Sequence, residues 1–321
     1  MGNSSPLPFL PDEIGSFLAH MRSLGFQYDT GERILTRFSE HTDSNLPGEV
    51  QLTREVAMAW AELRDGENPN TRTRRVSPVR GLAEHMIRHG GTAYVIPRNA
   101  LSSGNPYVPY IYTAGEIGAL FDACDRLAGG PRGGGYRLLL PCVMRLLYAT
   151  GMRHGEARRL KVSDVDLLSG TIAVGPSKTS EGRLVYISDE LCRLMSEFDS
   201  AMQGVAPNRE YFFSKLDGGM QCGRWLDPSF TAAKCIAGID EPGVVKRIHD
   251  LRHTFCVHRL NRWASEGKDV RAMLPYLSAY IGHKSLASTD YYLHLVPEFY
   301  RDYSTLTESR NTLIPECGSA R

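Results

Sequence analysis

Residues 249–258 read His-Asp-Leu-Arg-His-Thr-Phe-Cys-Val-His, so titratable side chains interrupt an otherwise apolar stretch. A spacing of three residues places His249 and Arg252 on one face of a helix, beside each other. Leu251 and Phe255 can pack elsewhere. A cation and an imidazole on one half-buried face repel each other when both are charged, and an anion between them relieves that repulsion. The stretch therefore predicts a helix that carries an anion site, and phosphate is the natural ligand.

A second segment places an arginine between two helices. Residues 149–156 read Ala-Thr-Gly-Met-Arg-His-Gly-Glu. The Thr-Gly break ends an apolar helix predicted over residues 136–149, and Arg153 begins the next helix near the core. Taken alone, this arginine is better explained by a structural ion pair with Glu156 than by a functional role.

A third segment places a tyrosine at a fixed distance from a histidine. Residues 280–294 read Tyr-Ile-Gly-His-Lys-Ser-Leu-Ala-Ser-Thr-Asp-Tyr-Tyr-Leu-His. His283 precedes Tyr292 by nine residues. Adjacent helical residues differ by about 100° in direction, so only one of Tyr291 and Tyr292 can face a given site.

The hydrophobic period changes between Leu167 and Ser188. Two short β-rich runs, at residues 171–174 and 184–187, are joined by a Gly/Pro/Ser-containing turn, which predicts a hairpin. The turn contains Lys178. A turn lysine is usually only solvated, but a mobile one can also reach into a cleft and deliver a proton.

The remaining pattern is helical and predicts two domains. Four short amphipathic helices, beginning near Pro11, Thr30, Thr53 and Thr71, fill the first 90 or so residues and carry no catalytic constellation. A new helix opens at Thr113, where Glu116 completes a capping box. We therefore expect a mostly α protein with a small antiparallel β-sheet, divided into a helical domain (1–95), a linker (96–112) and a second domain (113–321).

The composition is that of an ordinary globular protein, with 42% hydrophobic and 23% charged residues. No apolar run approaches the roughly 18 residues of a membrane span, and no secretory signal is evident at the N-terminus. The seven cysteines include no CxxC pair, which disfavours a zinc ribbon or a disulfide framework and suits a reducing cytoplasm. A net charge of +1 does not indicate nucleic-acid binding, although arginines greatly outnumber lysines.

Together these segments resemble the tyrosine recombinases, or phage-type integrases. Members of that family carry an arginine after Ala-Thr-Gly-x, a lysine in a β-hairpin, a His-x-Leu-Arg-His motif, and a Gly-His followed by a tyrosine. The resemblance spans about residues 113–300, and only the region between Arg252 and His283 looks several residues longer than in most relatives. The six matching positions occur in the family's order: Arg153, Lys178, His249, Arg252, His283 and Tyr292.

The resemblance implies a DNA strand transfer that uses no metal and no other cofactor. A tyrosine attacks the phosphodiester, which gives a 3′-phosphotyrosyl link and a free 5′-hydroxyl, as in a type IB topoisomerase. Protein cations must then meet the charge of the phosphorane. The implied roles are charge neutralisation by Arg153 and Arg252, protonation of the leaving oxygen by Lys178, help with the tyrosine proton by His249, donation to the phosphate by His283, nucleophilic attack by Tyr292, and orientation of Arg153 by Glu156.

The resemblance also implies partners. The 1–95 domain looks like the family's core-binding domain, which would enclose double-stranded DNA together with the catalytic domain. The working unit would be a homo-tetramer on DNA, in the cytoplasm and associated with the nucleoid. The best candidates for DNA contact are the arginines at the start of the fourth helix, although a merely solvated arginine face is the alternative: Arg72, Arg74, Arg75 and Arg80.

We favour integration or transposition of a mobile element, and the sequence leaves three alternatives. One is a chromosome or plasmid dimer resolvase of the same family. Another is a non-catalytic DNA-binding relative, which would have no chemical use for Tyr292 or Lys178. The most remote is a zinc metallopeptidase using His249 and His253, which have the spacing of paired ligands. Against it, Asp250 stands where such enzymes have a glutamate, and no convincing third ligand follows.

Overall fold

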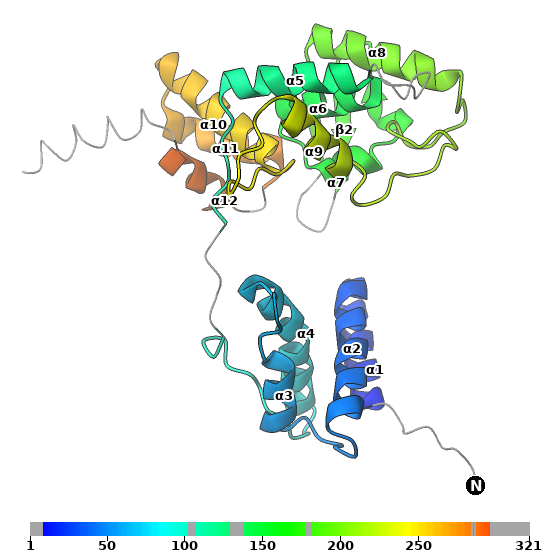
Figure 1. The fold of residues 1–321 in the computed structure, drawn as a ribbon, viewed down its shortest axis with the longest axis vertical. Coiled ribbons are helices and arrows are strands. Elements are labelled where there is room, and N and C mark those ends of the chain that lie inside the picture. The colour runs from blue at the N-terminus through cyan, green and yellow to red at the C-terminus, as the bar shows by residue number, and fades with distance from the viewer. Residues whose placement is uncertain are drawn as a thin grey trace, which may run out of the picture. The chain divides into compact units, whose positions relative to one another are not determined.

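The structure is a computed structural model that describes residues 9–101, 107–128, 138–176, 182–283, 285 and 287–295. The chain forms two compact units, Met1–Tyr107 and Val108–Arg321 (Figure 1). Lys178 lies outside the described residues. None of the helices within the described ranges is long and apolar enough to cross a membrane.

The first unit consists of four helices: α1 (Pro11–Ser23), α2 (Asp29–Asn45), α3 (Arg54–Ala61) and α4 (Pro69–Arg88). Their starts are set by local chemistry. The Thr53 hydroxyl caps α3 by accepting from the Val56 backbone N–H, and Asn68 caps α4, where Pro69 occupies the first turn. The helices bury a core around Phe38 and Trp60. The four predicted helices are confirmed.

Residues at both ends of the predicted linker, 96–112, pack against the two units. Ile96 and Leu101 are buried in the core of the first unit, and Tyr112 is fully buried in the core of the second. The sequence reads as a linker because Pro, Gly, Ser and Asn interrupt any period, yet single apolar residues within it still pack against each unit.

The second unit is mainly helical. The capping box predicted at its start is confirmed, since the Thr113 N–H donates to Glu116 Oε2 (2.8 Å) and the Glu116 N–H donates to Thr113 Oγ1 (3.2 Å). Helix α6 (Leu139–Thr150) is buried along most of its length and contacts α5 (Ala114–Ala128), α8 (Asp189–Gln203) and α10 (Asp250–Ser265). The helices are α5 (Ala114–Ala128), α6 (Leu139–Thr150), α7 (His154–Arg159), α8 (Asp189–Gln203), α9 (Asp227–Ile236), α10 (Asp250–Ser265), α11 (Val270–Ile281) and α12 (Ala287–Asp290), with 3-10 turns η2 (Val162–Asp164) and η3 (Tyr291–Leu295).

A small antiparallel sheet completes the unit, with strand order β1-β2-β3. The hairpin of β2 (Thr171–Val174) and β3 (Arg183–Tyr186) matches the prediction to within a residue. The third strand, β1 (Val165–Asp166), pairs with β2 and was not predicted, because two residues are too short to show a period. The predicted fold class, mostly α with a small antiparallel sheet, is confirmed.

Candidate active site

A glycine positions the first arginine of the site. Helix α6 ends at Gly151, whose φ of +62° is left-handed. A Cβ at this position would also lie 2.6 Å from the Phe255 ring of α10, so both the turn and the close helix approach require glycine here. The reversal makes Arg153 the first residue of the next turn, capping α7. The chain reversal at Gly151 therefore places Arg153 beside α10.

The carboxylate of Glu156 joins two arginines. It accepts from the Arg153 backbone N–H and from Arg153 Nη1, both at 2.9 Å. It also accepts from Arg183 Nη2 at 2.8 Å. Burial raises the pKa of Glu156, but the hydrogen bonds and charges of Arg183 and Arg153 outweigh burial and lower that pKa to about 2. The ionised carboxylate therefore orients Arg153 and ties the first residue of β3 to the same site.

Arg252 is the most deeply buried cation of the site, with 2% of its surface exposed. Its Nη1 donates to the Gly151 carbonyl (2.7 Å) and its Nη2 donates to the Ile281 carbonyl (2.8 Å). One guanidinium thus holds the ends of α6 and α11 against α10. Desolvation, followed by the charge of Arg153, lowers the pKa of Arg252 to about 10, which still leaves it charged at neutral pH.

Tyr292 points inward while Tyr291 points outward. Tyr292 is 2% exposed and Tyr291 is 40% exposed. The Tyr292 hydroxyl lies 2.9 Å from His253 Nδ1. The ring of His283 stacks near the Tyr292 ring, with centroids 6.2 Å apart and planes 13° apart, and His283 Nδ1 lies 2.8 Å from the buried Thr289 hydroxyl.

The imidazoles of the site are neutral at neutral pH. Desolvation and nearby cations lower the pKa of His253 and of His283 to about 4 each. The pKa of His249 is lowered by desolvation and then by His253 and Arg252. Desolvation, followed by the neighbouring Cys256 thiol, raises the pKa of Tyr292 far above its ordinary value, so the phenol keeps its proton. A neutral phenol beside a neutral imidazole is a proton donor with an acceptor in reach.

The structure brings five of the six predicted site residues into one region, and the sixth, Lys178, lies outside the described residues. Two residues that contact them escaped the sequence reasoning. Arg183 carries no signal, since an arginine in a short strand is commonplace. His253 was considered only as a zinc ligand. Its ring centroid lies 4.9 Å from that of His249, but no group of three or more His, Cys, Asp or Glu in the described ranges is placed to hold a metal.

Among the four arginines predicted to contact DNA, Arg75 requires correction. It is buried, its Nε and Nη2 donate to Glu67 (2.9 and 2.7 Å), its Nη1 donates to the Trp60 carbonyl, and its Nη2 also donates to the Glu62 carbonyl. Its donors serve the first unit's fold and are not available to phosphate. Arg80 Nε donates to the Ile96 carbonyl (2.7 Å). Of the four, Arg74 is the exposed one and Arg72 is half-buried.

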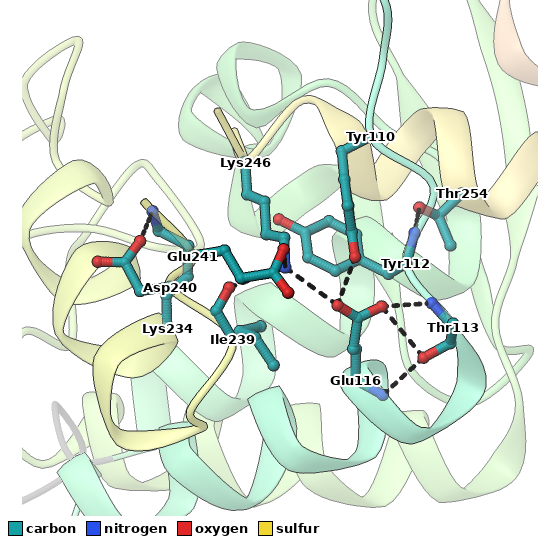
Figure 2. A network of polar contacts seen from close by, with 10 residues as sticks. All are labelled: Tyr110, Tyr112, Thr113, Glu116, Lys234, Ile239, Asp240, Glu241, Lys246 and Thr254. Atoms are coloured by element: carbon teal, nitrogen blue, oxygen red, sulfur yellow. Dashed lines mark hydrogen bonds and ion pairs between the residues drawn. The ribbon is translucent and has the colours of Figure 1, made fainter. Parts of the chain in front are cut away.

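A second polar network anchors the first residues of the second unit to the segment that leads into α10 (Figure 2). Lys246 Nζ lies 3.1 Å from Glu116 Oε1, and its side chain is only 1% exposed. The Tyr110 hydroxyl donates to the same carboxylate oxygen (2.6 Å), and the Tyr112 N–H donates to Thr254 Oγ1 (3.0 Å) on α10. The network therefore fixes residues on both sides of His249.

Comparison with known proteins identifies the family. The sequence profile of the phage integrase family matches residues 112–298. A provisionally named integrase/recombinase of Sinorhizobium fredii, y4rE, is 31% identical over 294 residues, which cover 89% of this chain and 91% of that protein.

Two solved structures share the fold. The XerH site-specific recombinase bound to a palindromic difH substrate, in a post-cleavage complex, aligns with a TM-score of 0.66 and 18% identity over 87% of this chain and 79% of that one. The Tn1549 transposon integrase in complex with transposon right end DNA aligns with a TM-score of 0.62 and 17% identity over 87% and 94%. With the profile covering more than half of its length, this chain belongs to the phage integrase family of tyrosine recombinases.

Proposed function

We propose that this protein is a site-specific DNA recombinase that breaks and rejoins DNA through a 3′-phosphotyrosyl intermediate on Tyr292. The observation that carries the proposal is the position of this hydroxyl. It is turned into a site lined by Arg252, His253 and His283, within electrostatic reach of Arg153. Two fixed guanidinium groups beside a phenol suit in-line attack on a phosphodiester, because the phosphorane carries one more negative charge than the ground state.

The remaining roles follow from the same geometry and from the family. Arg153 and Arg252 neutralise the non-bridging oxygens, and Glu156 holds Arg153 in place. His283, oriented by Thr289, donates to the phosphate. Lys178, which lies between β2 and β3 in the sequence, protonates the departing 5′-oxygen. The covalent intermediate conserves the energy of the phosphodiester bond, so rejoining requires no ATP.

We infer that the biological role is integration or transposition of a mobile element. The similarity to the Tn1549 transposon integrase, and to an integrase/recombinase over most of both chains, supports this role. A resolvase of chromosome or plasmid dimers is the second candidate, supported by the similarity to XerH bound to difH. In either role the partner is double-stranded DNA, and exchange between two duplexes requires four protomers.

Covalent capture tests both the chemistry and the role. The purified protein is incubated with sheared genomic DNA that contains its own gene, denatured, and digested, and the DNA attached to the protein is sequenced. We expect attachment at discrete sites through a 3′-phosphate on the peptide that contains Tyr292. Sites that flank the gene support a mobile element, whereas one site distant from the gene supports a resolvase.

The adjacent tyrosine provides the matched control. Tyr292→Phe removes one oxygen from a buried ring and should abolish covalent attachment while DNA binding persists. Tyr291→Phe makes the same chemical change on an exposed ring and should leave attachment intact. Attachment that survives in Tyr292→Phe and disappears in Tyr291→Phe would refute the assignment of the nucleophile.

A further inference from the structure

The second histidine of the His-Asp-Leu-Arg-His motif has no role in the proposed function, yet its ring nitrogen lies within hydrogen-bond distance of the nucleophile. His253 Nδ1 lies 2.9 Å from the Tyr292 hydroxyl, and the two ring centroids are 5.6 Å apart. His249, to which the resemblance assigns the tyrosine proton, contacts the ring of His253 instead, edge to face. The described contacts of Tyr292 thus favour a different acceptor.

We propose that His253 is a catalytic residue that accepts the proton of Tyr292 as the phenol attacks the phosphate. This inference rests on the proposed function and deepens it. In the step, the Tyr292 O–H bond breaks and an N–H bond forms at His253 Nδ1. The Tyr292 oxygen bonds to phosphorus, and the bond from phosphorus to the 5′-oxygen breaks, with the leaving oxygen taking a proton from the general acid. Rejoining runs the same transfers in reverse.

Three features of the surroundings suit His253 to this task. The Tyr292 residue is almost fully buried, so bulk water is a poor competitor for its proton. His253 is held on α10 directly after Arg252, whose guanidinium is fixed by two carbonyls, so the acceptor and the phosphate-binding cation move as one body. The lowered pKa of His253 leaves its imidazole neutral at neutral pH and able to accept.

The charged and titratable groups that face His253 come from each element around it. His249 and Arg252 belong to the same helix, Tyr292 belongs to η3, and His283 follows α11. Arg252 and His283 disfavour a proton on His253 in the resting site. A bound phosphate counteracts the effect of Arg252 and His283 at the moment of transfer, because its negative charge lies near them and favours a proton on His253.

The test measures the pH dependence of covalent attachment in a single turnover at saturating DNA. Asparagine places its side-chain oxygen near the position of His Nδ1, so His253→Asn can still accept a hydrogen bond from Tyr292 but cannot take a proton at neutral pH. We expect a wild-type rate that is flat from about pH 6 to 8 and a rate in His253→Asn that is lower by about 10²–10⁴-fold. The variant rate should also rise about tenfold per pH unit, because solvent base must remove the proton.

Helix α10 provides a matched control variant. His258 lies on the same helix, is half-buried, and has its Nδ1 3.0 Å from the Tyr148 hydroxyl, so it forms the same kind of pair away from the nucleophile. His258→Asn should keep the wild-type rate and the flat pH profile. DNA affinity should be unchanged in both variants, since neither imidazole is needed to hold phosphate.

Each outcome decides the matter. A His253→Asn variant with wild-type rate and profile overturns the proposal, and so does a His249→Asn variant that shows the tenfold rise in its place. If His253→Asn unfolds at the assay temperature, its rate is measured in the cold, and the pH profile of the wild type provides a second readout. A wild-type rate that already rises tenfold per pH unit would show that no neutral group of the protein accepts the proton, and this result also overturns the proposal. Loss of attachment in Tyr292→Phe is required in every case, so failure of the proposed function is recognised separately.

Discussion

The buried pair of Lys246 and Glu116 allows a quantitative prediction, because its two partners are buried to different extents. The Lys246 side chain is 1% exposed and the Glu116 side chain is 18% exposed. Lys246 Nζ also donates to the Ile239 carbonyl (2.8 Å) and lies 4.2 Å from the centre of the Tyr110 ring. Glu116 keeps three further donors, from Tyr110 and Thr113.

Removing the carboxylate should therefore cost more than removing the ammonium. Glu116→Gln leaves Lys246 charged and almost fully buried, with neutral partners (the Gln amide oxygen, the Ile239 carbonyl and the Tyr110 ring) and the exposed Glu241 carboxylate at 3.8 Å. Breaking a buried ion pair from one side typically costs about 3–5 kcal/mol of unfolding free energy. Lys246→Met leaves a carboxylate that is hydrogen-bonded and partly hydrated, so the expected cost is about 1–3 kcal/mol.

The double variant should recover much of that loss. With both charges gone, no unpaired ion is left in the core, and such replacements are often close to neutral. We expect the two single costs to exceed the cost of the double variant by about 1–3 kcal/mol, which is the usual size of coupling between contacting residues.

Hydrogen exchange in increasing urea is the appropriate assay, because two units need not unfold together. Peptides from α5 and α10 should report the change in stability, and peptides from α2 and α4 in the first unit should not. Equal and additive costs for the two single variants would refute the reasoning, and so would a larger cost for Lys246→Met.

The same pair predicts an acid dependence. Burial raises the pKa of Glu116, but hydrogen bonds from Tyr110, Thr113 and Lys246 outweigh burial and lower the pKa from 4.5 to about 2. A carboxyl group with a lowered folded-state pKa contributes stability that is present above its unfolded pKa and is lost as the pH falls through its folded pKa. The advantage of the wild type over Glu116→Gln should therefore shrink between about pH 4.5 and 2.

Three further predictions concern the arginines and their partners. Arg153→Ala should slow covalent attachment by about two to three orders of magnitude at saturating DNA while affinity stays within a few-fold, since its guanidinium opposes charge that develops in the transition state; normal attachment at saturation would make it a mere phosphate anchor. Glu156→Gln should slow attachment without weakening DNA binding, because it loosens the ion pair that orients Arg153 and spares the cation itself; an unchanged rate would show that Arg153 holds its position unaided. Arg75→Ala should destabilise the first unit and so speed hydrogen exchange in α4. Arg74→Ala should leave exchange unchanged but flatten the salt dependence of DNA binding, measured by titration at several salt concentrations. The reverse pattern would restore Arg75 as a DNA contact.

The parts of the fold that sequence reasoning predicted are those fixed by local chemistry. Thr53 and the Thr113–Glu116 box begin helices through hydrogen bonds that span three residues, so the sequence displays them directly. The β2–β3 hairpin follows in the same way from alternation and a turn. Strand β1 exists only because β2 lies beside it, and no local pattern announces such an element.

The residues that sequence reasoning misjudged are those whose role depends on a distant partner. Arg75 shares a helical turn with two arginines that are exposed or half-buried, and only the placement of Glu67 and of the Trp60 carbonyl makes it structural. His253 gains its contact because η3, which follows α12, returns Tyr292 to α10 across 39 residues of sequence. The motif fixes which side chains are present, whereas tertiary packing decides which of them touch.

The spacing of the motifs has a mechanical cause as well as a chemical one. Gly151 and Gly282 end α6 and α11 in the left-handed conformation, and the carbonyls of Gly151 and Ile281 accept from the two ends of the Arg252 guanidinium. Helix ends expose carbonyls that lack partners within the helix, and a buried arginine satisfies one on each side. The residues that follow these two helix ends are Arg153 and His283. The Arg252 guanidinium therefore helps to position Arg153 and His283. Under the proposed function, replacing Arg252 would remove a catalytic charge and would also loosen the two helix ends that carry the other proposed phosphate-binding groups.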